Sequence, residues 1–387
     1  MTTGIVVRRI GPAAYAELGP AFAELAGHAL EPNPHMAPSA VTAATMLVPE
    51  DDIIVLCAWF SEALDFEQLV GVWAFRRERD WRSGFASALA APLVPLYEVS
   101  SLPVLDRDHA ADAARALLRY LVASGDLPHT LLLPLLPLDG PCYATLAEAC
   151  RQTGSRISTY ERWVRPVMIP QPGDDSERYL RRALGSAYKK RMQQFRAVAK
   201  QGALTFRRSR GRAALDALDA FLTLEAAGWK GETGTAIACL PADAAYIRRM
   251  AELFAADDAL QIDTLLLDGQ VLATGLLVES GDRRHFLKIA YDEAQARHSP
   301  GRTLTIAMLQ ADLAGTPPAL FDSGAGEGVD PGTYIWGERR EMANAIIRIG
   351  PGRPGAAHAA TFSRMWLRRL RKALRARSGR ASPPKRR

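Results

Sequence analysis

The 387-residue sequence is poor in cysteine and contains no long apolar run. Its four cysteines (Cys57, Cys142, Cys150 and Cys239) form no C-x-x-C pair, and no Cys/His cluster has zinc spacing. This excludes the common zinc modules and predicts four free thiols in a reducing compartment. No stretch approaches the ~20 consecutive apolar residues of a membrane span. The N-terminal residues also lack the apolar segment of a secretory signal, so we expect a cytoplasmic protein.

Acidic residues are absent from the C-terminal end of the chain. Residues 364–387 contain eleven Lys or Arg and no Asp or Glu. The whole chain has a net charge of +6, which leaves −5 for residues 1–363. Any attraction to anions is therefore expected from the tail and not from the mildly acidic body. The hydrophobic content of 48% and the length suggest a globular chain of two domains.

Apolar patterning in the first half predicts strands, followed by alternating helices and strands. An acidic turn after the first predicted strand indicates a hairpin with the second. The expected elements are strands at 53–59, 69–75, 129–136 and 157–168, and helices at 112–124 and 143–152.

A long basic helix, 174–201, is predicted to link the two halves, with Gly202 after its end. In the second half Asp268-Gly269 is a strong hairpin signal between two strands, and 228–234 reads as a loop. The elements expected there are strands at 204–208, 260–267, 271–279, 284–291 and 319–323, and helices at 212–226, 241–255 and 303–313.

Ser299-Pro300-Gly301 follows a predicted strand and opens the helix at 303–313. Free N–H groups and the positive end of the dipole make a helix N-terminus an anion site. Glycine permits close approach of the backbone to the anion. Arg297 and Arg302 flank the segment and can supply charge-assisted hydrogen bonds. The segment is therefore a candidate site for a pyrophosphate.

Several motifs in order resemble one family. They are Leu224–Gly231 (LEAAGWKG), Ile289–Asp292 (IAYD), His298–Gly301 (HSPG), Phe321–Ala325 (FDSGA) and Trp336–Arg340 (WGERR). Together they look like the GNAT acetyltransferases of the CelD-like branch, associated with cellulose and exopolysaccharide biosynthesis. That branch is itself similar to the FemAB-type transferases. The match covers roughly residues 175–345.

The resemblance implies an α/β fold with a mixed sheet of the GNAT type, and the element order suggests two tandem GNAT-like domains. The expected division is an N-terminal domain at 1–170, a linking basic helix at 171–202, a C-terminal domain with the donor site at 203–350, and a basic tail at 351–387. The implied donor is acetyl-CoA or another acyl-CoA, without a metal. Its expected binding residues are Arg297, His298, Ser299, Pro300, Gly301, Arg302 and Thr303.

Acyl transfer from a thioester needs a base for the acceptor and an acid for the leaving thiolate. Glu225, Tyr291 and Asp322 are the catalytic candidates. Each also has an ordinary structural interpretation: an exposed carboxylate, a packed ring, or a polar residue after a strand. Trp229, Lys230 and Asp292 are candidates for binding the acceptor, with loop packing and capping as the alternatives.

Two basic segments suggest partners. Arg181, Arg182 and Lys189–Arg191 make a basic helix face, which is either solvated or a contact for tRNA or an anionic glycan. Residues 362–376 pattern as a basic amphipathic helix with Trp366 on its apolar face. Such a helix either packs on the protein, lies on an anionic surface such as the inner membrane, or binds another polyanion.

Three functions follow from these observations. The first is an acyltransferase that moves an acyl group from acyl-CoA to an amine or hydroxyl of a sugar, amino-sugar or polysaccharide precursor. The second is a FemAB-like transferase that uses aminoacyl-tRNA, the donor that the resemblance gives for those relatives. The third is a non-catalytic accessory protein of a polysaccharide synthase, because no unambiguous base is visible.

Overall fold

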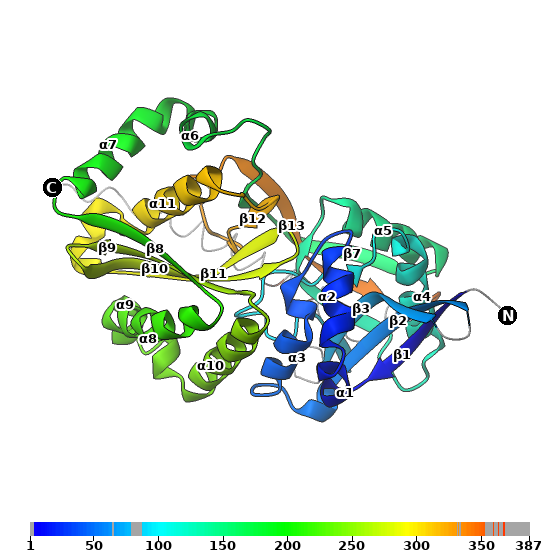
Figure 1. The fold of residues 1–387 in the computed structure, drawn as a ribbon. Helices are drawn as coiled ribbons and strands as arrows, with labels where there is room; N and C mark the ends of the chain where they lie inside the picture. The colour runs from blue at the N-terminus through cyan, green and yellow to red at the C-terminus, as the bar shows by residue number, and fades with distance from the viewer. Residues whose placement is uncertain are drawn as a thin grey trace.

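The computed structural model describes residues 4–63, 66–78, 87–330, 332, 334–352, 359, 363 and 367. Runs of strands and helices follow one another along the chain, and Figure 1 shows two halves joined side by side. The tail helix expected at 362–376 lies outside the described residues, apart from two isolated positions. Among the helices described, none is long and apolar enough to cross a membrane.

The first half begins with a strand and three short helices that the sequence patterns did not predict. Its helices bury alanine and leucine faces, as in the buried Ala113, Leu117 and Leu121 of α4. The elements are β1 (Gly4–Ile10), α1 (Pro12–Ala16), α2 (Gly19–Gly27), α3 (Pro38–Ala44), β2 (Ile53–Ala63), β3 (Phe66–Glu78), β4 (Ala88–Ala90), β5 (Val104–Leu105), α4 (Ala110–Ala123), β6 (Thr130–Pro137), α5 (Pro141–Gln152) and β7 (Arg156–Met168).

The second half repeats much of this order, and its last strand returns to the first half. Its elements are α6 (Ser176–Leu184), α7 (Tyr188–Ala199), β8 (Leu204–Arg210), α8 (Arg212–Ala227), α9 (Trp229–Glu232), α10 (Pro241–Ala256), β9 (Leu260–Leu267), β10 (Gln270–Ser280), β11 (Arg283–Tyr291), the 3-10 helix η6 (Glu293–His298), α11 (Pro300–Ala314), β12 (Leu320–Asp322) and β13 (Glu338–Arg348).

The 13 described strands form a single sheet, in the order β1-β2-β3-β4-β6-β13-β7-β12-β11-β10-β9-β8, with β5 paired to β3 outside this order. Each half contributes antiparallel strands followed by a parallel pair, β4 with β6 and β11 with β12. Strand β7 pairs with β13 and, near its end, with β12. The sheet therefore runs through both halves without a break, and β13 lies between β6 and β7 of the first half.

Helices cover both faces of the second half's sheet, as Figure 1 shows. One apolar cluster joins α11 to α6 and α7 through Leu304, Met308, Tyr179 and Met192. The other face carries α8 and α10, whose buried side chains belong to a cluster continuous with the core of the first half. The sheet thus separates an α11 face from an α8/α10 face. This architecture is the mixed α/β fold class that the sequence predicted.

The strands and helices predicted in the second half are confirmed within a few residues at their ends, with two exceptions. The helix expected at 174–201 is two helices, because the chain turns at Gly185, whose φ is +50°. Apolar residues keep a helical spacing on both sides of this break, so the sequence pattern did not indicate that the helix ends there. The expected loop at 228–234 contains the short helix α9. The predicted Asp268-Gly269 turn is present, and both residues have positive φ (49° and 79°).

A buried carboxylate ties the halves together. Glu31, which follows α2, accepts hydrogen bonds from Arg340 of β13 at 2.6 Å and from Arg283 of β11 at 2.9 Å. Its other oxygen accepts from the backbone N–H of Cys142 at 2.9 Å. Glu31 is only 3% exposed, so the position of β11 is fixed from the first half.

Candidate functional site

The sheet opens between β11 and β12. The two strands pair in parallel only from Arg283/Leu320 to His285/Asp322. Beyond this last pair β11 stays paired with β10 as far as Tyr291, whereas the chain after Asp322 enters a loop. The strands part at their carboxyl ends, which is where ligands bind in open α/β sheets.

A bulge in β11 lies at the start of this opening. Leu276 of β10 pairs with Lys288 and Leu277 pairs with Phe286, so Leu287 is the extra residue. A bulge bends its strand, leaves the extra residue without a ladder partner and redirects side chains. Phe286 accordingly packs in the cluster under α11, whereas Leu287 packs against the cluster on the α8/α10 face.

The opening forms a cavity of about 400 Å³. Thr305 of α11 borders it on one face of the sheet and Lys230 of α9 borders it on the other. The cavity is therefore lined by residues from both faces of the sheet. Its lining residues are Lys230, Phe286, Leu287, Lys288, Ile289, Thr305, Ser323, Gly324, Ala325, Gly326, Val329, Tyr334 and Trp336.

Helix α11 starts beside the opening. Its N-cap, Ser299, has a left-handed backbone (φ 53°, ψ 57°), and its carbonyl accepts from the N–H groups of Arg302 and Thr303 at 3.0 and 3.1 Å. A Cβ on Gly301 would lie 3.1 Å from Cδ1 of Ile289, which lines the cavity. The close approach explains the glycine, and it sets the positive end of the helix dipole against the strand that borders the cavity.

Two guanidinium groups lie at this helix start. Arg302 is half-buried, and its Nη1 is 3.5 Å from Oγ of Ser299. Burial and the neighbouring cation of Arg191, on α7, lower the pKa of Arg302. Two cations and a helix N-terminus suit a pyrophosphate.

The remaining residues predicted for donor binding are continuous with this helix start. The exposed Arg297 donates from Nε to Nε2 of His298 at 2.8 Å, and His298 also contacts Gln201 of the linking segment. Pro300 is the first residue of α11, and the hydroxyl of the buried Thr303 lies 3.3 Å from the carbonyl of Ser299. Asp292 accepts from the N–H of Ala294 at 2.9 Å and so caps η6.

Glu225 and Lys230 meet on the opposite face. Oε1 of Glu225 is 2.7 Å from Nζ of Lys230, and Oε2 accepts from the N–H of Ile237 at 3.0 Å. Glu225 is buried, which differs from the exposed carboxylate of its ordinary interpretation. The side chain of Trp229 belongs to a residue that is 53% exposed, and the backbone N–H of Trp229 donates to Glu293 at 2.9 Å. Tyr291 lines a small hollow with both Glu225 and Trp229.

Asp322 is buried at the end of β12, where its carboxylate faces the first half. It lies 3.3 Å from Nη1 of Arg165 and accepts from the N–H of Gly324 at 2.8 Å. Burial opposes its ionisation, but the guanidinium groups of Arg165 and Arg340 help to hold its pKa below the usual value. His285 lies opposite in the register, where burial lowers its pKa to about 4, so the ring is neutral at pH 7.

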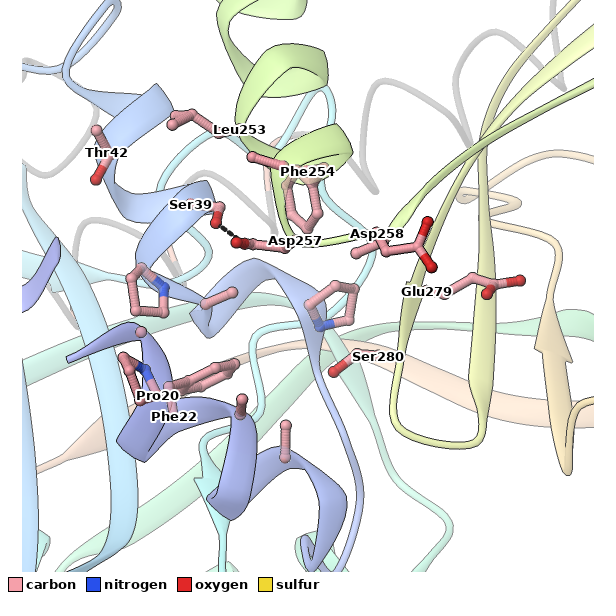
Figure 2. A pocket seen from close by; sticks show the side chains of 18 of the residues that line it. Pro20, Phe22, Ser39, Thr42, Leu253, Phe254, Asp257, Asp258, Glu279 and Ser280 are labelled. Carbon is pink, nitrogen blue, oxygen red and sulfur yellow. Dashed lines mark hydrogen bonds between the residues drawn. The ribbon is translucent and has the colours of Figure 1, made fainter. Parts of the chain in front are cut away.

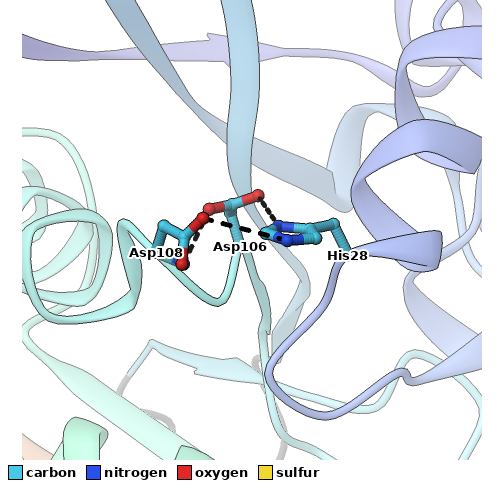
Figure 3. A group of neighbouring side chains, drawn as sticks. All are labelled: His28, Asp106 and Asp108. Atoms are coloured by element: carbon cyan, nitrogen blue, oxygen red, sulfur yellow. Dashed lines mark hydrogen bonds and ion pairs between the residues drawn. The ribbon is translucent and has the colours of Figure 1, made fainter.

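The helix of the first half that corresponds to α11 is α4, and its N-terminus has the opposite charge. Asp106 accepts from the backbone N–H groups of Asp108 and His109 at 3.0 and 3.2 Å. Figure 3 shows His28 and Asp108 beside it, with Nδ1 of His28 3.0 Å from Asp106. The ring of His109 binds the same carboxylate. The segment just before α4 is thus acidic, whereas Arg302 lies in the first turn of α11.

A larger cavity, of about 820 Å³, lies elsewhere between the halves. Figure 2 shows Phe22 and Phe254 facing it from the two halves, and Ser39 bonded to Asp257 at its wall. Its lining comes from α1 to α3, from α10 and from the turn between β10 and β11. It shares no residue with the opening between β11 and β12, so its size does not identify it as the reaction site.

Sequence patterns missed three residues at or near the opening, and they placed a fourth, Arg191, on the basic helix face and not at the donor site. Arg165, Arg191, Tyr97 and Lys288 come from β7, α7, a loop of the first half and β11. The signal that could have singled out Lys288 is a charge inside an apolar strand (Phe286-Leu287-Lys288-Ile289-Ala290). Tyr97 and Arg165 are remote from the motifs in sequence and carry no such signal.

Comparison with known proteins agrees with this geometry. Residues 186–328 match the family model described as an acetyltransferase (GNAT) domain. The matched segment contains the whole opening except Val329, Tyr334 and Trp336. A search of curated proteins found no significant match.

Solved structures resemble the chain over most of its length. FemX is 9% identical, with a TM-score of 0.57 over 89% of this chain and 98% of that chain. The C-terminal domain (DUF2156) of a protein from Agrobacterium fabrum, named as a lysylphosphatidylglycerol synthetase, is 12% identical, with a TM-score of 0.52 over 90% and 94%. At these identities the likeness shows the fold alone.

Proposed function

We propose that this chain, which carries a GNAT-type acetyltransferase domain over residues 186–328, transfers an acyl group from acyl-CoA to an amine or hydroxyl. The observation that carries the proposal is the opening between β11 and β12, which adjoins the N-terminus of α11. The acceptor would be a sugar, an amino-sugar or a polysaccharide precursor, as the CelD-like motifs suggest.

The donor would enter from the α11 face. Its pyrophosphate would lie at Ser299–Thr303, near the guanidinium groups of Arg302 and Arg191. The pantetheine arm would run into the opening along β11, where the strand has no partner beyond His285 on the β12 side. Unpaired strand N–H and C=O groups can bind an amide chain as a neighbouring strand would.

The first half is a poor alternative for the donor. Its corresponding helix, α4, is preceded by the buried Asp106 and the exposed Asp108. These carboxylates would repel a pyrophosphate at the position where α11 offers cations. One donor site per chain, in the second half, is therefore the consistent arrangement.

The reaction forms a bond from the acceptor nitrogen or oxygen to the acyl carbon and breaks the carbon–sulfur bond. The acceptor loses a proton and the departing thiolate gains one. Glu225 and Asp322 already have partners, namely Lys230 with the Ile237 N–H, and Arg165 with the Gly324 N–H. We assign them to positioning. Tyr291 adjoins the start of α11, because a Cβ on Gly301 would be 3.7 Å from its ring, and it is the candidate that protonates the thiolate.

Release of CoA thiol in the presence of acetyl-CoA and a panel of amino-sugar and sugar acceptors tests the proposal. We expect acceptor-dependent thiol release, and Tyr291→Phe is expected to lower turnover with little change in acetyl-CoA affinity. Saturable acetyl-CoA binding without transfer to any acceptor would favour an accessory role. Failure to bind any acyl-CoA would remove the proposal.

Transfer from aminoacyl-tRNA is the second candidate, supported by the resemblance to FemAB-type transferases and by the basic helix face. Arg181 is paired with Glu177, and Arg182 is paired with both Asp174 and Glu338. Those acids neutralise two of the five cations of that face, so it attracts RNA less than the sequence suggested. Product formation that requires charged tRNA and not acyl-CoA would establish this alternative.

A further inference from the structure

Two lysines line the opening near its α8/α10 face. Lys230 comes from α9, and Lys288 comes from β11 immediately after the bulged Leu287. The two ammonium groups are close enough for Lys230 to contribute to lowering the pKa of Lys288, after the larger effect of burial. The cations proposed to bind the donor, Arg191 of α7 and Arg302 of α11, lie on the other side of the sheet. The lysines therefore face the side left for the acceptor.

Lys230 is held in place by a fixed carboxylate. Its Nζ lies 2.7 Å from Oε1 of Glu225, whose other oxygen accepts from the N–H of Ile237. Glu225 is 5% exposed, whereas the lysine side chain is 27% exposed. The carboxylate thus lies behind the ammonium group, and the ammonium group borders the cavity.

Lys288 has no carboxylate within ion-pairing distance in the part of the chain that the structure describes. Its Nζ lies over the ring of Tyr97, 5.0 Å from the centroid. The hydroxyl of Tyr97 donates to Asp243, so this nearby carboxylate is bound to the tyrosine. Tyr97 comes from the first half and packs against Tyr246 of α10. The first half therefore completes the surroundings of a lysine in the second half's opening.

This arrangement suits an anion. A half-buried ammonium group without a carboxylate is unfavourable, and a second cation nearby adds to the cost. Glu225 and Asp243 offset part of that cost at longer range, but each is engaged by another partner. A carboxylate or phosphate between the two lysines would give Lys288 a close countercharge and give both ammonium groups a further hydrogen-bond acceptor.

We propose that the acceptor carries a carboxylate or phosphate group bound between Lys230 and Lys288, with Tyr97 of the first half holding Lys288 in place. This inference rests on the proposed acyl transfer in the same cavity. It assigns specificity to residues outside the donor site, and it gives the first half a role in acceptor recognition.

Calorimetric titrations into the CoA-saturated protein test the proposal with matched probes. Glucosamine 6-phosphate and alanine carry the two anions, and glucosamine and alaninamide are their counterparts without an anion. We expect one anionic probe to bind at least tenfold more tightly than its counterpart, and the pair that shows the preference identifies the anion. In Lys288→Met the preference should fall about tenfold, the effect of one charge-assisted hydrogen bond. In Lys288→Arg it should persist.

The Lys288→Met change removes a half-buried charge and keeps an unbranched apolar stem, so we expect the variant to fold. Lys200→Met, an exposed lysine at the end of α7, is the matched control and should keep the preference. Equal affinity for charged and neutral probes, no binding of either anionic probe, or an unchanged preference in Lys288→Met would overturn the proposal. Acetyl-CoA affinity of the same samples is the separate measure of the proposed function. If the wild-type protein does not bind acetyl-CoA, that result would instead contradict the proposed acyl transfer.

Discussion

Asp322 of β12 and Arg165 of β7 form a buried ion pair, with Oδ2 and Nη1 3.3 Å apart. Arg165 is completely buried, and it also donates from Nε to the carbonyl of Ala325 at 2.9 Å and from Nη1 to that of Val99 at 2.7 Å. It therefore holds the loop that forms one wall of the opening, and it joins that loop to the first half. Asp322 neutralises the guanidinium that does this.

Asp322→Asn is expected to destabilise the protein, because it leaves the Arg165 guanidinium buried without a countercharge. The loss should be about 3 kcal/mol, in the range measured for broken buried pairs. Urea unfolding measures it. The double variant Asp322→Asn/Arg165→Met removes both charges and should recover part of the loss. Unchanged stability with lost turnover would instead mean that Asp322 takes part directly in the chemistry.

The same pair predicts an acid dependence. Because the pKa of Asp322 is lowered in the folded protein, its contribution is fully present above the ordinary carboxyl value of 3.8 and is lost as the pH falls through the folded value. The difference in unfolding free energy between wild type and Asp322→Asn should therefore shrink from pH ~6 to pH ~3. A difference that stays constant over this range would contradict the lowered pKa.

Glu31→Gln tests the link between the halves. The substitution leaves Arg340 and Arg283 without the carboxylate they share, and we expect a loss of about 3 kcal/mol. Its control is Glu67→Gln, which removes the exposed partner of Arg8 and should leave the melting temperature unchanged. Equal melting temperatures for both variants and the wild type would show that the buried carboxylate does not hold β11 and β13 to the first half.

Gly301 is predicted to be needed for close packing as well as for the donor. In Gly301→Ala the new Cβ would press on Cδ1 of Ile289 at 3.1 Å. We expect weaker acetyl-CoA binding, because the start of α11 must shift away from the strand. Adding Ile289→Val removes the touching methyl and should restore part of the affinity. Calorimetry measures the acetyl-CoA affinity of the single and double variants. Unchanged affinity in Gly301→Ala would mean that the donor does not bind near this contact.

Local sequence patterns predicted the elements whose signals lie within a short stretch of the chain. The Asp268-Gly269 turn and the strands on either side of it follow from turn chemistry and apolar runs. The HSPG segment was expected to open a helix, and α11 begins at its proline. The candidates Glu225, Lys230 and Tyr291 meet around one small hollow, although more than sixty residues separate Lys230 from Tyr291 in the sequence.

Features that depend on packing between distant segments could not be predicted in this way. The break at Gly185 falls within a continuous helical spacing, and tertiary contacts decide how the chain turns there. The bulge at Leu287 depends on the register with β10, and the insertion of β13 depends on β6 and β7. Asp322 looked like a free carboxylate after a strand, because its partner Arg165 lies 157 residues earlier.

The central claim is that the start of α11 binds the donor's pyrophosphate, and calorimetric titration of acetyl-CoA into wild type and Arg302→Gln tests it most directly. The variant removes one charge-assisted interaction of ~1.5–3 kcal/mol, so affinity should fall by roughly tenfold to a hundredfold. Arg248→Gln, a change in an exposed arginine of α10, should bind as the wild type does. Saturable binding that weakens only in Arg302→Gln is the predicted result. Equal affinity in all three proteins, or no binding by the wild type, would contradict the account.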